Sequence, residues 1–70
     1  MIIYIQRDST GFLRSFSVSN LLEAIDSASD ALTRPAYDNT ESITIYRIDT
    51  RTHSVRERCK VYRGGKVIDL

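Results

Sequence analysis

The sequence predicts one α+β domain in two layers, an antiparallel sheet of about five strands (ββαβββ) with one helix on one face. Three observations lead to this prediction. Segments rich in β-branched and aromatic residues alternate between apolar and polar positions within 2–18 and 43–70. One amphipathic segment with helical spacing lies between them, in 19–33. The length of 70 residues suits a single domain, 1–70.

The first two strands are expected in residues 2–7 and 12–18. Between them, residues 8–11 are turn formers, with Thr10-Gly11 at the centre of the turn. The cross-strand pairs that follow are Ile5 with Phe16, Ile3 with Val18, and Arg7 with Arg14. This register gathers large apolar pairs on one face, and it also opposes two like charges, which is unfavourable.

A helix is expected in residues 19–33. Ser19 or Asn20 can cap its N-terminus, because either side chain can accept hydrogen bonds from the first backbone N–H groups. Pro35 ends it, since the residue before a proline avoids the helical conformation. An apolar stripe is expected to face the sheet and an acidic row to face water. The stripe is Leu21, Ile25, Ala28 and Leu32, and the acidic row is Glu23, Asp26 and Asp30.

The last three strands follow a polar loop in residues 35–42. The strand 43–50 is apolar on both faces, which predicts either a central position in the sheet or a strand whose outer face is covered. The chain then ends in a hairpin, because Gly64-Gly65 is a strong signal for a two-residue turn. The pairs expected from this turn are Val61 with Ile68, Cys59 with Leu70, Tyr62 with Val67, and Lys60 with Asp69.

The terminal hairpin carries the strongest functional signal in the sequence. Strict alternation would turn Val55, Cys59 and Val61 toward the helix and the intervening cations away from it. One helix covers only about three strands, so the other face of the sheet is expected to be open. We therefore predict a partner-binding site on the open face, consisting of Arg56, Arg58, Lys60, Tyr62 and Tyr46. The secondary candidates are Arg47, Arg63 and Lys66, and Tyr4, Ile48 and Val67 are expected on the same face.

The charge distribution supports a binding role for this part of the chain. Residues 1–46 carry three basic and six acidic side chains, whereas residues 47–70 carry seven basic and three acidic ones. Such a dipolar surface steers partners and favours one orientation of encounter. The alternative is that the cations only form the solvated side of a strand, where arginine and lysine are common.

No pattern indicates catalysis, a metal or a cofactor, so we expect a non-enzymatic protein that uses none. Zinc sites usually need four ligands, and the chain has one histidine and one cysteine. We expect Cys59 in the core and His53 in a solvated loop. The glycine pair lacks the spacing of a phosphate-binding loop and is explained by the hairpin turn.

Composition also bears on location. A single cysteine allows no internal disulfide, which fits a reducing compartment. No run approaches the ~20 apolar residues that span a membrane. The first five residues are apolar but too few for a signal peptide, and no basic stretch precedes them. We therefore expect a cytoplasmic protein.

In length and element order the chain resembles small phage-encoded type I anti-CRISPR proteins. The features that carry the resemblance are Ile2–Arg7, the helix Ser19–Arg34, and the run Ile43–Leu70 with its glycine turn. No residue motif is involved, so no functional residue is carried over. The resemblance implies a stoichiometric inhibitor in the bacterial host cell. Such an inhibitor docks on a CRISPR surveillance complex and blocks target DNA or nuclease recruitment.

The basic face leaves two other partners open. Cations and aromatic rings on an open sheet also hold single-stranded nucleic acid, although the signature of the RNA-recognition motif is absent. A small nucleic-acid-binding regulator is therefore the alternative to an inhibitor that docks on an acidic protein surface. The open face is also suited to pairing with a second copy about a two-fold axis, which would make a homodimer.

Overall fold

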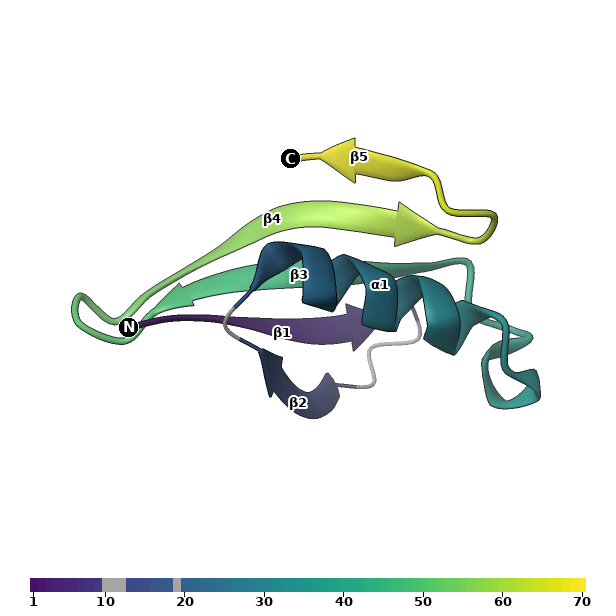
Figure 1. The fold of residues 1–70 in the computed structure, drawn as a ribbon, viewed down its shortest axis with the longest axis horizontal. Coiled ribbons are helices and arrows are strands. Elements are labelled where there is room, and N and C mark those ends of the chain that lie inside the picture. The colour runs from purple at the N-terminus through teal and green to yellow at the C-terminus, as the bar shows by residue number, and fades with distance from the viewer. Residues whose placement is uncertain (10–12, 19) are drawn as a thin grey trace.

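The computed structural model describes residues 1–9, 13–18 and 20–70 and shows one antiparallel sheet with a helix on one face (Figure 1). The strands are β1 (Ile2–Asp8), β2 (Leu13–Val18), β3 (Ser42–Asp49), β4 (Ser54–Tyr62) and β5 (Val67–Asp69). The helix α1 (Leu21–Leu32) follows β2, and a short 3-10 helix (Pro35–Tyr37) precedes β3. The predicted α+β class is confirmed, as is the single α-helix on one face of an antiparallel sheet.

The strands lie side by side in the order β2-β1-β3-β4-β5, so β3 is central, which is one of the two alternatives that its two-sided apolar pattern predicts. No helix in the described part of the chain is both long and apolar enough to span a membrane. The predicted turn at Thr10-Gly11, the start of the second predicted strand at Phe12, and Ser19 lie outside the described residues.

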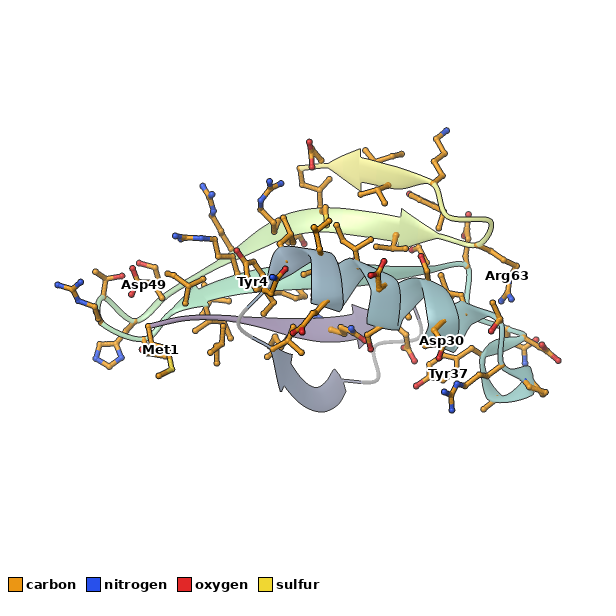
Figure 2. The ribbon with its side chains drawn as sticks, viewed as in Figure 1. Met1, Tyr4, Asp30, Tyr37, Asp49 and Arg63 are labelled. Carbon is orange, nitrogen blue, oxygen red and sulfur yellow. The ribbon has the colours of Figure 1, made fainter. Side chains whose placement is uncertain are left out.

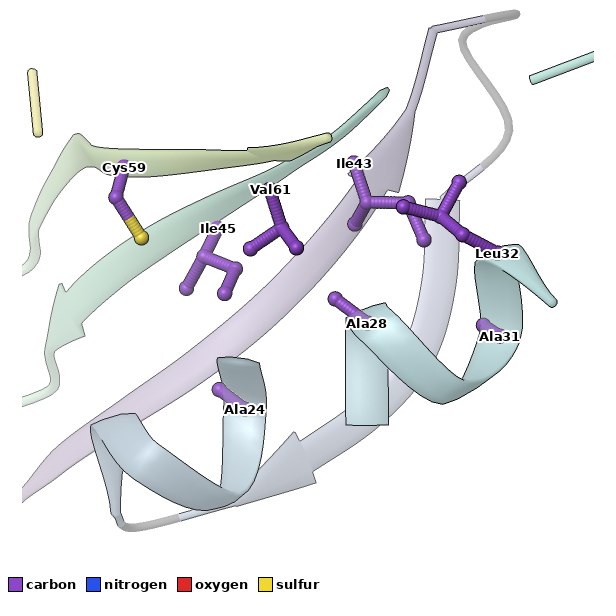
Figure 3. Close-up of a cluster of buried hydrophobic side chains, with 8 residues drawn as sticks. All are labelled: Ala24, Ala28, Ala31, Leu32, Ile43, Ile45, Cys59 and Val61. Carbon is purple, nitrogen blue, oxygen red and sulfur yellow. The ribbon is translucent and has the colours of Figure 1, made fainter. Parts of the chain in front are cut away.

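The core lies between α1 and the middle of the sheet (Figure 3). Ala24, Ala28 and Ala31 have almost no exposed surface, and their small side chains allow the helix backbone to approach the strands closely. The buried residues are Ala24, Ala28, Ala31, Leu32, Ile43, Ile45, Cys59 and Val61. Leu21 and Ile25 from the predicted stripe pack at the margin of this cluster instead of at its centre. The helix is therefore turned so that its alanines face the sheet.

Asn20 caps the helix. The sequence allowed either Ser19 or Asn20 in this position. Its side-chain oxygen accepts hydrogen bonds from the backbone N–H groups of Leu22 at 2.8 Å and Glu23 at 3.4 Å. These are two of the donors that the first turn of a helix leaves without an intrahelical partner. The helix ends at Leu32, one residue before the predicted end.

Strand β1 presents its polar side chains to the helix, contrary to the sequence prediction. Gln6 is fully buried, and its amide nitrogen donates to the carbonyl oxygen of Ala24 at 3.0 Å. Tyr4 packs against the core from the same face, whereas Ile3 and Ile5 point to the other side of the sheet. The donor of this buried side chain is paired with the helix backbone, whereas its oxygen Oε1 has no hydrogen-bond partner among the described residues.

The predicted register of the first hairpin is also wrong. An irregularity between Tyr4 and Gln6 shifts the pairing of β1 with β2. The observed pairs are Tyr4 with Val18, Gln6 with Arg14, and Arg7 with Leu13. Arg7 therefore lies opposite Leu13 in place of the predicted Arg14.

A β-bulge in β4 changes which side chains of that strand face the helix. Ile45 of β3 lies opposite Cys59. The next residue, Tyr46, lies opposite Glu57, which leaves Arg58 as an extra residue in β4. Residues before the bulge therefore point to the side opposite from the one that strict alternation predicts.

The bulge overturns the predicted facing of the first half of β4. Val55 was predicted to face the helix, yet it lies opposite Ile48 on the far side and is 61% exposed. Arg56 was predicted to point away from the helix, yet it shares the helix side with Arg47. Cys59, beyond the bulge, is buried as predicted.

The terminal hairpin turns at the predicted glycines with a different register. Gly64 and Gly65 both have positive φ, at 92° and 88°, which glycine adopts without steric cost. The Tyr62 N–H donates to the Lys66 carbonyl oxygen, so three residues form the loop in place of two. The observed pairs are Val61 with Val67, Lys60 with Ile68, and Cys59 with Asp69. The predicted Lys60–Asp69 pair is therefore wrong, and Val67 lies on the helix side.

Arg63, a secondary site candidate, joins the hairpin to the end of the helix (Figure 2). Its guanidinium donates to the carbonyl oxygens of Leu32, of Tyr37 at 2.7 Å and of Thr40 at 2.8 Å. The first of these is among the carbonyls that a helix C-terminus leaves unpaired. Arg63 therefore ties three segments together, and its donors are used inside the protein.

Replacing Arg63 with alanine is expected to lower the free energy of unfolding by about 2 kcal/mol, because hydrogen bonds from a charged donor to three carbonyls are lost. Arg63→Lys should recover part of that loss. Chemical denaturation measures both. The control is Lys66→Ala, an exposed cation on the same loop, which should stay within about 0.5 kcal/mol of the wild type. Equal stability of the two alanine variants would contradict this role.

Candidate functional site

The bulge places two arginines directly opposite each other on the side of the sheet that α1 covers, which we call the helix face. Arg47 of β3 pairs with Arg56 of β4, and on its other side it pairs with Tyr4 of β1. Directly opposite residues share a face and have Cβ atoms about 5 Å apart. Tyr4, Arg47 and Arg56 therefore form one line across three strands, which we call the arginine row.

The arginine row lies beyond the end of the helix. A helix of 12 residues is about 18 Å long, whereas the molecule extends 36 Å along its longest axis. Figure 1 shows β3 and β4 continuing past the N-terminal end of α1 toward their connecting turn. Figure 2 places Tyr4 beside that end of the helix, with Asp49 farther toward the turn. The row is therefore accessible on the helix face.

No acidic side chain neutralises the row within the described residues. The two ion pairs found there are Arg34 with Asp30 at 2.9 Å and Arg58 with Asp69 at 3.0 Å. Asp49 lies on the next row, and its carboxylate accepts the backbone N–H of Arg51 at 2.9 Å. Like charges directly opposite in a sheet are destabilising. The register therefore sets two cations opposite each other, and neither is in an ion pair with a described acidic residue.

The predicted site residues are divided between the two sides of the sheet. Tyr46, Lys60 and Tyr62 do lie on the side away from α1, which we call the open face, because they are opposite Glu57, Thr44 and Ser42. Arg56 lies on the helix face. The predicted five-residue cluster is therefore not one surface, because the bulge separates its members.

Arg58 occupies the bulge and is engaged within the protein. Its guanidinium contacts the carboxylate of Asp69 on the edge strand, and the arginine side chain is 31% exposed. The backbone carbonyl of Arg58 also accepts the Leu70 N–H at 3.2 Å. Among the secondary candidates, Arg47 joins the arginine row, Arg63 bonds to internal carbonyls, and Lys66 is exposed in the turn.

Sequence reasoning missed the partnership of Arg47 with Arg56 and the place of Tyr4 beside them. Both depend on the bulge and on β1 turning its even-numbered side chains to the helix. One signal was available in the sequence. Arg56, Glu57 and Arg58 are three consecutive charged residues. In a strand that alternates strictly and has one buried face, at least one of them would have to lie on the buried face, which indicates an irregularity.

Cys59 and His53 are not brought together. Cys59 is buried in the core at 1% exposure, as predicted, and His53 is exposed in the β3–β4 turn with a φ of 57°. In the part of the chain that the structure describes, no group of three or more His, Cys, Asp or Glu side chains is arranged to hold a metal ion.

No protein-family model matches the chain, and neither curated proteins nor solved structures gave a match.

The opposition of Arg47 and Arg56 predicts that Arg56→Glu stabilises the free protein. The new carboxylate would lie opposite Arg47, and a favourable cross-strand ion pair contributes about 0.5 kcal/mol in place of a repulsion. Urea denaturation at low salt measures the gain, which should shrink as salt screens the pair. Arg51→Glu, in the exposed turn, makes the same charge change as a control. If both variants respond alike, the two arginines do not repel each other.

The buried thiol predicts a loss of stability at alkaline pH. Burial raises the pKa of Cys59 above its ordinary value of 9.0, and Asp69 adds to this while Arg58 opposes it. The folded protein therefore retains the thiol proton at a pH where the unfolded chain has lost it. The thiol's contribution to stability is complete below the unfolded pKa and declines as the pH rises through the folded pKa.

Denaturation of the wild type and of Cys59→Ala at neutral pH and near pH 10 tests this. The alanine variant is less stable overall because it leaves a cavity. Its stability should nonetheless fall less steeply with pH than that of the wild type. Parallel pH dependence in the two proteins would show that the thiol does not contribute.

Proposed function

We propose that this protein is a non-enzymatic binding protein that docks on an acidic partner through the arginine row. The observation that carries this proposal is the opposition of Arg47 and Arg56 without a neutralising acid among the described residues. Two facing guanidinium groups repel each other in the free protein, and both gain when a carboxylate lies between them. Each can bind a carboxylate through two parallel hydrogen bonds.

The chemistry of the row favours a protein as partner. Tyr4 extends the row on the β1 side, half-buried against the core. Tyrosine and arginine are the residue types enriched at the energetic centres of protein interfaces. Tyr4 is held in place by packing, so its burial in an interface costs little conformational freedom. An acidic protein surface with an apolar margin fits this arrangement.

The resemblance to small phage-encoded type I anti-CRISPR proteins gives the proposal its specific form. The partner is then a subunit of a CRISPR surveillance complex in the cytoplasm of a bacterial host. The protein acts as a stoichiometric inhibitor that blocks target DNA or nuclease recruitment. The separation of acidic and basic residues along the chain would orient the encounter.

Nucleic acid is the second candidate partner, and the same row favours it. Paired arginines suit phosphate oxygens as well as carboxylates, and a half-exposed tyrosine offers a ring on which a base can stack. The two partners differ in salt dependence, because each phosphate contact contributes roughly one unit to the slope of log affinity against log salt.

Purified type I surveillance complex, which retains its guide RNA but carries no other nucleic acid, is titrated with the wild-type protein and with the double variant Arg47→Gln/Arg56→Gln. We expect one-to-one binding by the wild type and at least tenfold weaker binding by the variant, since a lost interfacial charge pair costs ~2 kcal/mol or more. The control is Arg34→Gln/Lys66→Gln, which makes the same charge change at exposed positions away from the row.

Other outcomes contradict the proposal. Equal weakening by both double variants would mean that net charge, and not the row, controls binding. Wild-type binding by the row variant would direct attention to the acidic helix side at Glu23 and Asp26, which are exposed. Steeply salt-dependent affinity for bare DNA or RNA, with no binding to the complex, would establish the nucleic-acid alternative in its place.

A further inference from the structure

The open face of the sheet carries an apolar surface that spans three neighbouring strands. Ile3 of β1, Ile48 of β3 and Val55 of β4 lie in one cross-strand line. The next line contains Ile5, Tyr46 and Glu57. The helix packs on the other side of the sheet, as Figure 1 shows.

This surface is unusually apolar for the exposed side of a small sheet. Val55 is 61% exposed within a regular strand, and Ile68 on the edge strand is 40% exposed. An antiparallel sheet that faces water on one side normally places polar residues there. Contiguous apolar patches of this kind mark interaction sites.

The order of the side chains along β4 indicates which partner fits the open face. On the open face this strand presents, in order, Val55, Glu57, Lys60 and Tyr62, because the bulge at Arg58 brings Glu57 and Lys60 onto the same side. The order is apolar, acidic, basic, aromatic. Turned end for end about a point between Glu57 and Lys60, the row matches itself with opposite charge: acid meets base, and valine meets tyrosine.

We propose that the open face packs against the open face of a second copy of the chain. The two-fold axis lies in the plane of the interface and runs perpendicular to the strands. It passes over β4 at the point between Glu57 and Lys60. Glu57 of one copy then meets Lys60 of the other, twice per dimer, as in any isologous interface. Val55 of one copy meets Tyr62 of the other by the same operation. On the neighbouring strands Tyr46 lies opposite Thr44 of the other copy, and Ile5 lies opposite Arg7.

The size of the face suits such a dimer. The molecule measures 36 × 20 × 18 Å, and the sheet extends along the longest of these dimensions. A face of this extent is on the order of the ~800 Å² that each partner contributes to an interface of standard size. Sheets packed face to face place their strands within about 30° of each other, which is compatible with the nearly antiparallel β4 strands of this dimer.

The inference is independent of the proposed function, because it uses the other side of the sheet. A dimer of this geometry would leave both arginine rows on its two outer sides. One dimer would then offer two equivalent binding sites, pointing in opposite directions.

A charge-swap series tests the proposal. Sedimentation velocity of the full chain, from about 1 μM to about 1 mM, covers the range in which modest interfaces associate. We expect a reversible monomer–dimer equilibrium for the wild type. Glu57→Lys and Lys60→Glu should each weaken dimerisation at least tenfold, because each creates two like-charge contacts across the axis. The double variant Glu57→Lys/Lys60→Glu should restore it.

Mixing the two single variants sharpens the test. Their faces carry opposite charges at the paired positions, so the mixture should form heterodimers more tightly than either variant forms homodimers. Val55→Asp, at an exposed position, should also weaken the dimer while thermal melting shows the fold intact. A wild type that stays monomeric throughout the series would overturn the proposal. A dimer that is indifferent to both single variants would overturn it too, since the contact would then lie elsewhere, such as at the β5 edge.

Discussion

The single extra residue in β4 controls the arrangement of both surfaces of this protein. Without the bulge at Arg58, the strand could not place Cys59 and Val61 in the core and also turn Arg56 to the helix face. A bulge reverses the facing of every side chain before it while the ladder continues on both sides. Here it also exposes Val55 on the open face. The facing of Val55, Arg56 and Glu57 follows from this one local change.

The bulge is anchored at both ends by tertiary contacts. On the core side, Cys59 and Val61 are held beneath the alanine face of α1. On the edge side, the Arg58 side chain pairs with Asp69, and the Arg58 carbonyl accepts the Leu70 N–H. An ion pair whose carboxylate is 81% exposed contributes little stability by itself. Its value lies in orienting the extra residue toward β5, away from the arginine row.

Both sides of the sheet carry features that lower the stability of the free protein and that a binding partner could compensate. The helix face carries a repulsive arginine pair beyond the end of α1, and the open face carries apolar side chains in contact with water. A domain this small buries only about 60% of its extended surface, so it has little stability to spare. Features that reduce stability in the free chain are most simply understood when a partner compensates them, and the two faces call for partners of different chemistry.

The sequence by itself determined the class of fold, a helix cap at Ser19 or Asn20, and a turn at the glycine pair, because periodicity, capping and positive φ are local properties. It also indicated a basic C-terminal region. Only the tertiary structure decided which face each cation occupies. A one-residue irregularity leaves almost no trace in composition, yet the period of two converts it into a change of side. The burial of Cys59 and Val61 against the helix, together with the bulge that precedes them, separates Arg56 from Lys60 and Tyr62.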